Sequence, residues 1–375
     1  MSAAYRLLQP GDPAPWFRQR NTSNPDYAFD SVAGRYILLC FLGSAGQSGG
    51  AQRLAFAEAQ RALFDDDRLA FFGVSADPQD EAQGRLQERL PGMRHFWDFD
   101  RRVSRLYGAL PLQPQPAAEE VYRPFWLLLN PNLQVRALLP FANDDSDLPA
   151  LLELLGTLPP VAGFAGTDLH APVIQIPAIF EPAFCEQLIG EYRRHGGEVS
   201  GFMQEVDGRT VGRHDPRHKV RSDHLVEDEA LKREIQQRIR RRVASVIRQV
   251  HCFEATRMER YLVACYDAAD GGHFRAHRDN TTRGTAHRRF ALSINLNDDF
   301  EGGELHFPEY GPRRYKPPAG SGVVFSCSLL HAVDPVRRGQ RFAFLPFLYD
   351  DAAAALREAN QAFLAEKDAG YRAGG

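Results

Sequence analysis

Long hydrophobic runs are absent from this sequence of 375 residues. No stretch approaches the roughly 20 apolar residues that a membrane-spanning helix needs, and residues 1–6 lack the apolar core of a secretory signal. The formal net charge of −3 excludes the basic excess that is typical of nucleic-acid-binding chains. We therefore expect a protein without a membrane or nucleic-acid partner.

Cysteine is also scarce and shows no paired spacing. An odd number of scattered thiols argues against a disulfide framework and predicts small buried apolar residues in a reducing compartment. We therefore expect a cytoplasmic protein. The five cysteines are Cys40, Cys185, Cys252, Cys265 and Cys327.

The length predicts two or three domains, and the hydrophobic share of 43% is ordinary for a globular chain. Residues 1–160 alternate strand and helix signals. Continuous apolar runs predict buried strands, an alanine-rich stretch at 55–64 predicts a helix, and an Asn-Pro-Asn turn predicts a closing hairpin. The order predicts an α/β domain. Its expected strands cover residues 36–42, 69–75, 125–129 and 134–139.

Three local matches accompany this order of elements. They are the opening Gly11-Asp12-Pro13-Ala14-Pro15, the strand end Gly73-Val74-Ser75-Ala76-Asp77, and Arg123 with Phe125. The segment resembles the peroxiredoxins, a thioredoxin-fold family, in which that arginine belongs to the active site. The resemblance implies a thioredoxin-like α/β fold for residues 1–160.

The peroxidatic cysteine of that family has no counterpart here. The family places it in a loop after the first core strand, where this chain has Gly43, Gln47 and Gly50 and no cysteine before Cys185. Cys40 lies inside an apolar run, where burial disfavours a thiolate. We therefore expect a scaffold for docking or dimerisation without peroxidase chemistry. Two alternatives stay open: a module that presents a protein partner to the second domain, and a thiol peroxidase fused to that domain, which the missing cysteine opposes.

Residues 161–170 are rich in proline, glycine and alanine and are expected to form a linker. Residues 171–350 should form a second domain, and residues 351–375 a tail that is helical to about Lys367. Within the second domain we expect a strand at 173–176, a helix from Pro182 and an amphipathic helix at 230–250 with a solvated arginine face. The polar segment 198–224 predicts a solvated loop, with a mobile lid as the alternative.

Short apolar segments separated by glycine-containing turns follow from about residue 260. This pattern is typical of an antiparallel sandwich closed as a jelly roll, the double-stranded β-helix, with flanking helices. Such a fold can hold a metal ion and a small molecule at its mouth. The expected strands are 290–296, 303–307, 322–325 and 341–347.

His277 and Asp279 are two residues apart, so in an extended segment both side chains point to the same side. His331 would supply a third ligand from a separate strand. Two histidines and one carboxylate on one face leave positions of an octahedral ion open, as non-haem Fe(II) oxygenases require. Chance alone supplies about one His-x-Asp in a chain of this composition, so a surface histidine and a turn aspartate are the plain alternative for the isolated pair.

The sequence around His277 and Asp279 favours the metal-binding interpretation. The region 171–350 resembles the prolyl 4-hydroxylase-like branch of the Fe(II)/2-oxoglutarate dioxygenases. The resemblance implies iron as Fe(2+), 2-oxoglutarate and O2 as co-substrates, L-ascorbate as an additional cofactor, and hydroxylation of a peptidyl, prolyl or small-metabolite substrate with release of succinate and CO2. The matching blocks are Tyr266, Gly271-Gly272, His277-Arg278-Asp279, Leu296-Asn297-Asp298-Asp299-Phe300-Glu301-Gly302-Gly303-Glu304-Leu305, Gly320 to Phe325, His331 and Arg341.

The same resemblance assigns the co-substrate contacts. Arg341, ten residues after His331, matches the basic residue that grips the far carboxylate of 2-oxoglutarate, and a guanidinium suits bidentate carboxylate binding. Tyr266 matches the hydroxyl donor to the co-substrate. Asn295 stands where the family often has a tyrosine, and is predicted as a second contact.

Overall fold

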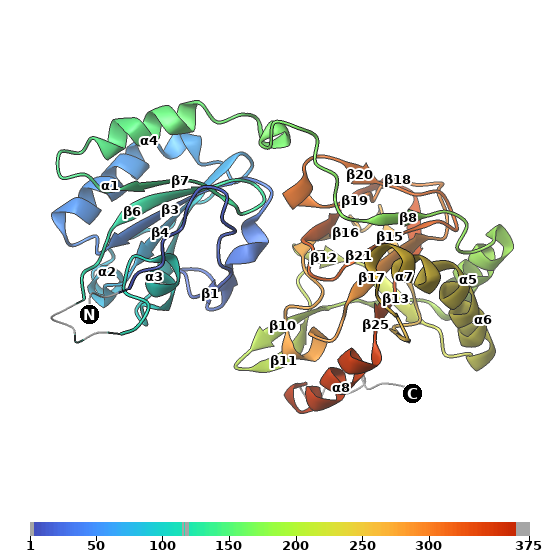
Figure 1. The fold of residues 1–375 in the computed structure, drawn as a ribbon. Helices are drawn as coiled ribbons and strands as arrows, with labels where there is room; N and C mark the ends of the chain where they lie inside the picture. The colour runs from blue at the N-terminus through green and yellow to red at the C-terminus, as the bar shows by residue number, and fades with distance from the viewer. Residues whose placement is uncertain (1–3, 115, 117–119, 365–375) are drawn as a thin grey trace. The chain divides into compact units, whose positions relative to one another are not determined.

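The computed structural model describes residues 4–114, 116 and 120–364. The chain divides into two compact units (Figure 1). Unit 1 comprises Met1–Leu169 with Pro308–Gly311, and unit 2 comprises His170–Phe307 with Pro312–Gly375. Among the described residues, no helix combines the length and apolar character needed to cross a bilayer.

Unit 1 is built on a mixed sheet with the strand order β5-β4-β3-β6-β7. The two strands β4 and β5 run parallel to β3, whereas β6 runs antiparallel to β3 and forms an antiparallel hairpin with β7. The apolar runs thus form the predicted strands, whereas β5 was not anticipated. The bounds are β3 Tyr36–Gly43, β4 Leu69–Ser75, β5 Met93–Trp97, β6 Phe125–Leu129 and β7 Val135–Pro140, with a small hairpin of β1 Arg18–Gln19 and β2 Tyr27–Ala28.

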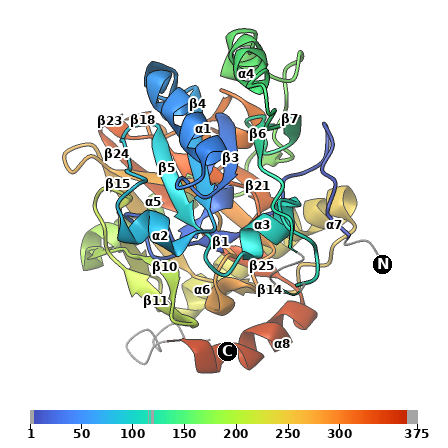
Figure 2. The ribbon, with the colours of Figure 1, turned by 90° about the vertical axis from the view of Figure 1, so that its left-hand side faces the viewer.

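Two helices, α1 (Ser48–Ala59) and α4 (Asp147–Gly156), cover the same side of this sheet (Figures 1 and 2). The helix predicted at 55–64 therefore begins earlier and ends at Ala59. The other side packs aromatic rings that include Phe72 and Tyr107, the last residue of α3 (Arg102–Tyr107). A short helix, α2 (Pro78–Ala82), follows β4. Unit 1 is therefore a three-layered α/β domain with an apolar core on each face of the sheet.

Unit 2 contains a large antiparallel sheet in the order β14-β25-β17-β24-β15-β13-β9, with β21 and β8 joined through β17. Its faces carry the apolar side chains predicted for residues 290–296, 322–325 and 341–347. The bounds are β8 Ile174–Ile176, β9 Glu198–Val199, β13 Ser222–Leu225, β14 Arg257–Glu259, β15 Leu262–Asp267, β17 Phe290–Asn295, β21 Gly322–Ser326, β24 Gln340–Phe344 and β25 Phe347–Tyr349.

A smaller antiparallel sheet has the order β12-β16-β22-β19-β20. Together the two sheets form the antiparallel β-rich, double-stranded β-helix type of domain that the sequence predicted. Further pairs are β10-β11 and β18-β23. The bounds are β10 Phe202–Val206, β11 Arg209–Arg213, β12 Lys219–Val220, β16 His273–His277, β18 Glu301–Gly302, β19 Leu305–His306, β20 Arg314–Tyr315, β22 His331–Val333 and β23 Val336–Arg338.

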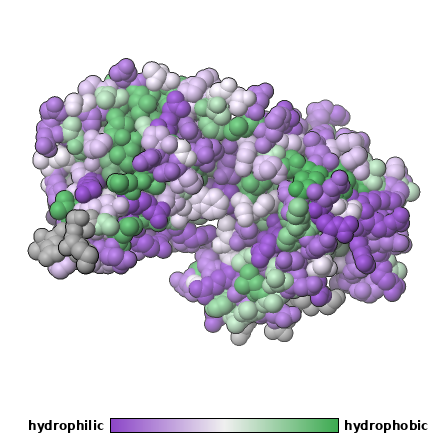
Figure 3. Space-filling model, in the orientation of Figure 1, coloured by the Kyte–Doolittle hydropathy of each residue, from purple (hydrophilic) through white to green (hydrophobic). Residues whose placement is uncertain are grey.

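Helices α5 (Pro182–His195), α6 (Glu229–Ile239) and α7 (Ser245–His251) pack their apolar faces against the large sheet. A π-helical turn over Arg240–Ala244 joins α6 to α7. The amphipathic helix predicted at 230–250 is thereby confirmed, except that Val250 is exposed. Figure 3 shows hydrophilic residues over much of the surface at the right of the view, where Figure 1 labels α5 and α6.

The segment 198–224 is not the solvated loop that its polarity predicted. It contributes five strands, from β9 to β13, and buries Lys219 and Arg221. The tail helix α8 spans Asp351–Ala359 and is followed by a short turn; the predicted helix beyond residue 364 lies outside the described residues. Four of the five cysteines are buried and unpaired, as expected, and Cys252 is exposed.

Candidate metal centre and co-substrate pocket

His277, Asp279 and His331 converge in the smaller sheet of unit 2. His277 ends β16, His331 begins β22, and the two are direct register partners. The Nε2 atoms of His277 and His331 lie 3.6 and 3.3 Å from the two carboxylate oxygens of Asp279. Ligand atoms of an octahedral ion with bonds near 2.1 Å lie roughly 3.0 Å apart, so small side-chain adjustments suffice to enclose one ion.

Hydrogen bonds fix the two imidazoles in one orientation. His277 Nδ1 donates to the Arg275 carbonyl at 2.8 Å, and His331 Nδ1 donates to the Leu329 carbonyl at 3.0 Å. Each ring therefore directs the lone pair of Nε2 toward Asp279, which is the tautomer that metal ligation requires. The main-chain N–H of Asp279 donates to the Cys327 carbonyl at 2.9 Å and fixes the third ligand.

The electrostatics of the group suit a bound cation. Burial, followed by the neighbouring His331, lowers the pKa of His277 to about 4. Burial opposes ionisation of Asp279, but the adjacent His331 and His277 outweigh it and lower the pKa of the carboxyl group. At neutral pH His277 is thus a neutral imidazole and Asp279 an ionised carboxylate, the protonation states that a divalent ion binds. This donor set fits Fe(II).

Arg341 lies on β24, opposite Tyr266 of β15, and only 3% of its surface is exposed. Its Nε donates to Asn295 Oδ1 at 3.0 Å and its Nη2 donates to Ser293 Oγ at 2.9 Å. The buried Nη1 has no hydrogen-bond partner, and among the described residues no carboxylate forms an ion pair with this guanidinium. Burial lowers the pKa of Arg341, and this effect outweighs the opposing influence of Tyr266 and Glu304. A buried cation without an ion-pair partner is costly, so this guanidinium is a candidate for binding an anion.

Both the oxygen and the nitrogen of the Asn295 side-chain amide form hydrogen bonds within the protein. Its Oδ1 accepts from Arg341, and its Nδ2 donates to the Pro317 carbonyl at 2.7 Å. The structure thus gives Asn295 a role in holding the guanidinium of Arg341, while direct contact with a co-substrate stays a prediction.

Tyr266 is buried beneath two guanidinium groups. Its ring centroid is 5.2 Å from Cζ of Arg341 and 5.7 Å from Cζ of Arg221. Its hydroxyl accepts a hydrogen bond from Arg221 Nη1 at 3.3 Å, so the hydroxyl proton is free to be donated elsewhere. Residues 267–272, which follow Tyr266, form a turn in which Gly272 packs against the Tyr266 main chain, where an added Cβ would come within 2.8 Å of Tyr266 Cα.

Arg221 is a residue that the sequence analysis missed. Its Nη2 donates to Asp223 at 2.6 Å and to Ser200 Oγ at 3.2 Å, whereas its buried Nε has no partner. Nearby, the buried Lys219 donates to the same Ser200 Oγ at 2.7 Å. The available signal was the two-residue spacing of Lys219, Arg221 and Asp223, which places all three on one side of a strand.

A second buried network supports the loop that carries Asp279. Arg288 donates to Glu259 at 2.7 Å and to the Asp279 carbonyl at 3.3 Å. Glu259 also contacts Nε2 of His287 at 3.0 Å, so this buried histidine belongs to the supporting network. His273, by contrast, contacts only main-chain carbonyls through its ring nitrogens, at 2.7 and 3.5 Å.

Known proteins with similar sequences also indicate an iron-binding oxygenase site in this region. Residues 261–349 match the family profile described as the 2OG-Fe(II) oxygenase superfamily, and this range contains the metal group, Tyr266 and Arg341. A "PKHD-type hydroxylase" of Pseudomonas fluorescens is 43% identical over 91 residues, which cover 22% of this chain and 39% of that protein. The match thus spans about two fifths of the length of that curated relative.

Two solved structures also show similarity to the chain. A prolyl-4-hydroxylase of Pseudomonas putida is 20% identical and covers 54% of this chain and 98% of its own, with a TM-score of 0.38. A thiol peroxidase from Chromobacterium violaceum is 19% identical and covers 41% of this chain and 90% of its own, with a TM-score of 0.33. By the family profile and the curated relative, the C-terminal part of the chain is similar to 2OG-Fe(II) oxygenases and to PKHD-type hydroxylases, and His277, Asp279 and His331 form a candidate metal group within the matched residues.

Proposed function

We propose that this chain is an Fe(II)- and 2-oxoglutarate-dependent dioxygenase that converts a substrate C–H bond to C–OH. The second oxygen atom of O2 enters succinate, and CO2 leaves from the C1 carboxylate of 2-oxoglutarate. The observation that carries the proposal is the buried Nη1 of Arg341, which has no hydrogen-bond partner. This guanidinium belongs to the same unit as the group of two histidines and one aspartate.

A continuous series of contacts links the metal group to this guanidinium. The rings of His277 and Phe274 stack with centroids 3.5 Å apart, and Lys219 Nζ lies 4.9 Å from the Phe274 ring. From Lys219 the contacts run through Ser200 to Arg221 and on to Tyr266, whose ring lies against Arg341. The metal group and the buried cations therefore belong to one connected region.

The charges of this region favour a dicarboxylate. Arg341 and Arg221 each retain a buried N–H without a partner, and Asp223 is the carboxylate that Arg221 contacts. We propose that Arg341 binds the far carboxylate of 2-oxoglutarate and that Tyr266 donates its hydroxyl proton to the same group. In this role Arg221 orients the hydroxyl, because its own hydrogen bond occupies the acceptor side of the Tyr266 oxygen.

The side chains of the protein orient the metal ligands and exclude water from them. Fe(II), when bound by His277, Asp279 and His331, supplies the activation of O2 that decarboxylation and hydroxylation require. The Nδ1 hydrogen bonds hold both imidazoles in the ligating tautomer. Phe274 stacks on His277, and Phe325 packs against His331 with centroids 4.6 Å apart, so apolar rings exclude water from the ligands.

The test is oxygen-dependent conversion of 2-oxoglutarate to succinate by the purified chain loaded with Fe(II). We expect succinate in the absence of any added substrate at a slow rate, and faster formation with the correct peptide or small metabolite from a panel that includes prolyl peptides. Failure to bind 2-oxoglutarate in the presence of the metal would refute the proposal.

Unit 1 has no thiol suited to peroxidase chemistry. Cys40, its single cysteine, is fully buried, and burial raises the pKa of this thiol well above its ordinary value. We propose instead that unit 1 binds a protein partner, as the sequence allowed. This proposal is supported by the exposed large apolar side chains of unit 1, which are Leu7, Trp16, Leu90, Leu112, Val121 and Leu152. If changing Cys40 to serine abolished a peroxidase activity, the thiol alternative would be restored.

A further inference from the structure

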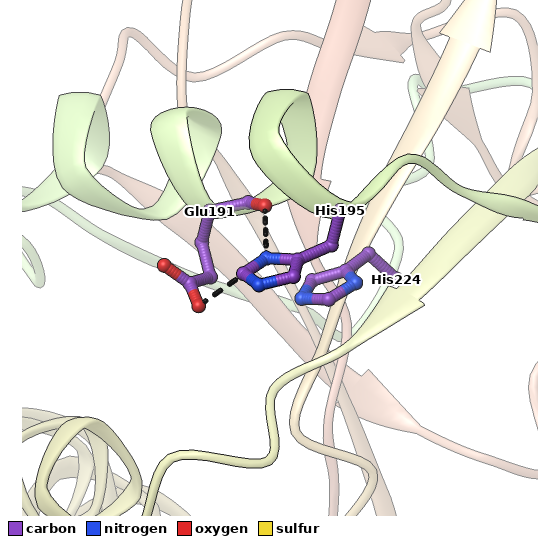
Figure 4. A group of neighbouring side chains, drawn as sticks. All are labelled: Glu191, His195 and His224. Atoms are coloured by element: carbon purple, nitrogen blue, oxygen red, sulfur yellow. Dashed lines mark hydrogen bonds and ion pairs between the residues drawn. The ribbon is translucent and has the colours of Figure 1, made fainter.

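Unit 2 holds a second group of potential metal ligands, on its surface. Glu191 and His195 belong to the last two turns of α5, and His224 belongs to β13 (Figure 4). One ligand atom from each lies within 4.8 Å of the others. We propose that these three side chains form a second metal site, which binds Zn²⁺.

The backbone places the three groups side by side. Residues four apart lie on one face of a helix, so Glu191 and His195 are neighbours on α5. His224 reaches the same spot from the adjacent strand, and its ring stacks on that of His195 with centroids 5.0 Å apart and an interplanar angle of 7°. A helical Glu–His ion pair requires only the first two residues and does not account for a second imidazole stacked on the first.

The hydrogen bonds leave the ring nitrogens that a metal needs. His195 Nδ1 donates to the Glu191 carbonyl at 3.0 Å, so its Nε2 carries the lone pair, as in established metal sites (Figure 4). Within the described part of the chain, the ring of His224 makes no hydrogen bond. Burial, followed by the neighbouring His195, lowers the pKa of His224. A neutral imidazole is the state that coordinates an ion.

The donor set selects the ion. Two imidazoles and one carboxylate, with a fourth position for water, are a ligand combination of Zn²⁺. With bonds of about 2.0–2.1 Å, tetrahedral ligands lie roughly 3.3 Å apart, so binding contracts the group and turns one ring out of the stack. His195 can make this turn because it is exposed and ends α5.

Two existing contacts compete with the ion. His195 Nδ1 lies 3.5 Å from Glu191 Oε1, on the side of the ring opposite to the nitrogen proposed as the ligand. Arg194 pairs with Glu191 Oε2, the carboxylate that would bind the metal. Zinc must displace this exposed pair, whose contribution to stability is small. Removing Arg194 should therefore tighten zinc binding, whereas a purely structural Glu–His pair predicts no such gain.

A bound ion would join the end of α5 to β13. That strand pairs with β15, the strand that carries Tyr266, and it also contains Asp223, the partner of Arg221. Zinc would therefore stabilise β13, the strand next to β15 and Tyr266, without contacting the proposed catalytic residues. Because it binds the folded state, it should raise the unfolding temperature as its concentration increases.

The experiment uses the full chain with His277→Ala and Asp279→Ala, so that the first metal group cannot bind, and Zn²⁺ as the only added ion. Titration calorimetry and native mass spectrometry should show one ion per chain. Adding Glu191→Gln or His224→Ala should weaken binding at least about tenfold, and adding Arg194→Ala should strengthen it. His170→Ala, which removes an exposed imidazole outside both groups, is the matched control.

Absence of a bound ion in the parent variant would overturn the inference. Equal zinc affinity before and after His224→Ala would do the same, provided that circular dichroism shows both variants folded. Because the titrations are made without the catalytic metal group or 2-oxoglutarate, their outcome is independent of the proposed dioxygenase activity.

Discussion

Two arginines, one in each unit, are buried to the same extent and differ in every other respect. Arg53 of unit 1 and Arg341 of unit 2 are each 3% exposed. Arg53 pairs with Asp147 and Asp145 and donates to the Ala142 carbonyl. Arg341 has only neutral partners and one free buried N–H. The first charge is neutralised by the fold, and the second is left for a ligand; this difference separates a structural cation from a binding one.

The comparison depends first on the metal group in the same unit as Arg341, and removal of this group should have the largest effect. His331→Ala removes one of three ligands, so we expect iron binding and succinate formation to fall by more than about 100-fold, beyond the loss seen when supporting groups are removed. Iron content and succinate are measured on the same sample. His273→Ala, outside the group, should retain both. A His331→Ala chain that keeps its iron would remove this residue from the ligand set.

Arg53→Ala tests the structural side of the comparison. It leaves the buried carboxylate of Asp147 without its partner, so we expect unit 1 to lose about 3–5 kcal/mol of unfolding free energy. All three tryptophans lie in unit 1, so fluorescence during denaturation with urea reports on this unit. The exposed Arg61→Ala is the control and should change stability by less than about 0.5 kcal/mol. Equal losses for the two variants would contradict the assigned role of Arg53.

Arg341→Ala tests the binding side. Charge-assisted hydrogen bonds contribute about 1.5–3 kcal/mol, so we expect the KM for 2-oxoglutarate to rise about tenfold to hundredfold. Stability without 2-oxoglutarate should be nearly unchanged, because the removed charge has no ionic partner to leave behind. Arg341→Lys should recover part of the affinity. Strong destabilisation with an unchanged KM would make Arg341 a structural cation like Arg53.

Arg221 should give the smallest effect, because it acts through Tyr266. We expect Arg221→Gln to raise the KM for 2-oxoglutarate about twofold to tenfold, the range of a single hydrogen bond. Tyr266→Phe should give a similar rise, and the double variant should be little worse than either. Fully additive effects in this double-mutant cycle would show that the two residues act separately.

The sequence predicted those parts of the molecule in which local pattern and tertiary environment agree. The strand β3 was predicted within one residue because its continuous apolar run is buried on both faces. The metal group was predicted because its ligands stand in a recognisable order along the chain. Helix α1 was predicted seven residues too late, since its first turns contain two glycines and little periodicity.

The errors concern polar residues that the fold buries. Residues 198–224 predicted a solvated loop because charge normally indicates solvent, but here Lys219 and Arg221 face a polar interior that only the tertiary structure creates. Asn295 shows the same limit. Its position in the motif indicated a co-substrate contact, which stays a prediction, but not the hydrogen bonds of its amide with Arg341 and the Pro317 carbonyl. Side-chain partners of this kind cannot be read from spacing.

The direct pairing of His277 with His331 has a consequence for how the protein matures. A strand displaced by one residue would turn its histidine to the opposite face, and the ion could not be held. Correct alignment of β16 with β22 and competence to retain iron are thus a single event in folding. Iron incorporation into newly made chains would accordingly report whether this ladder has formed in register.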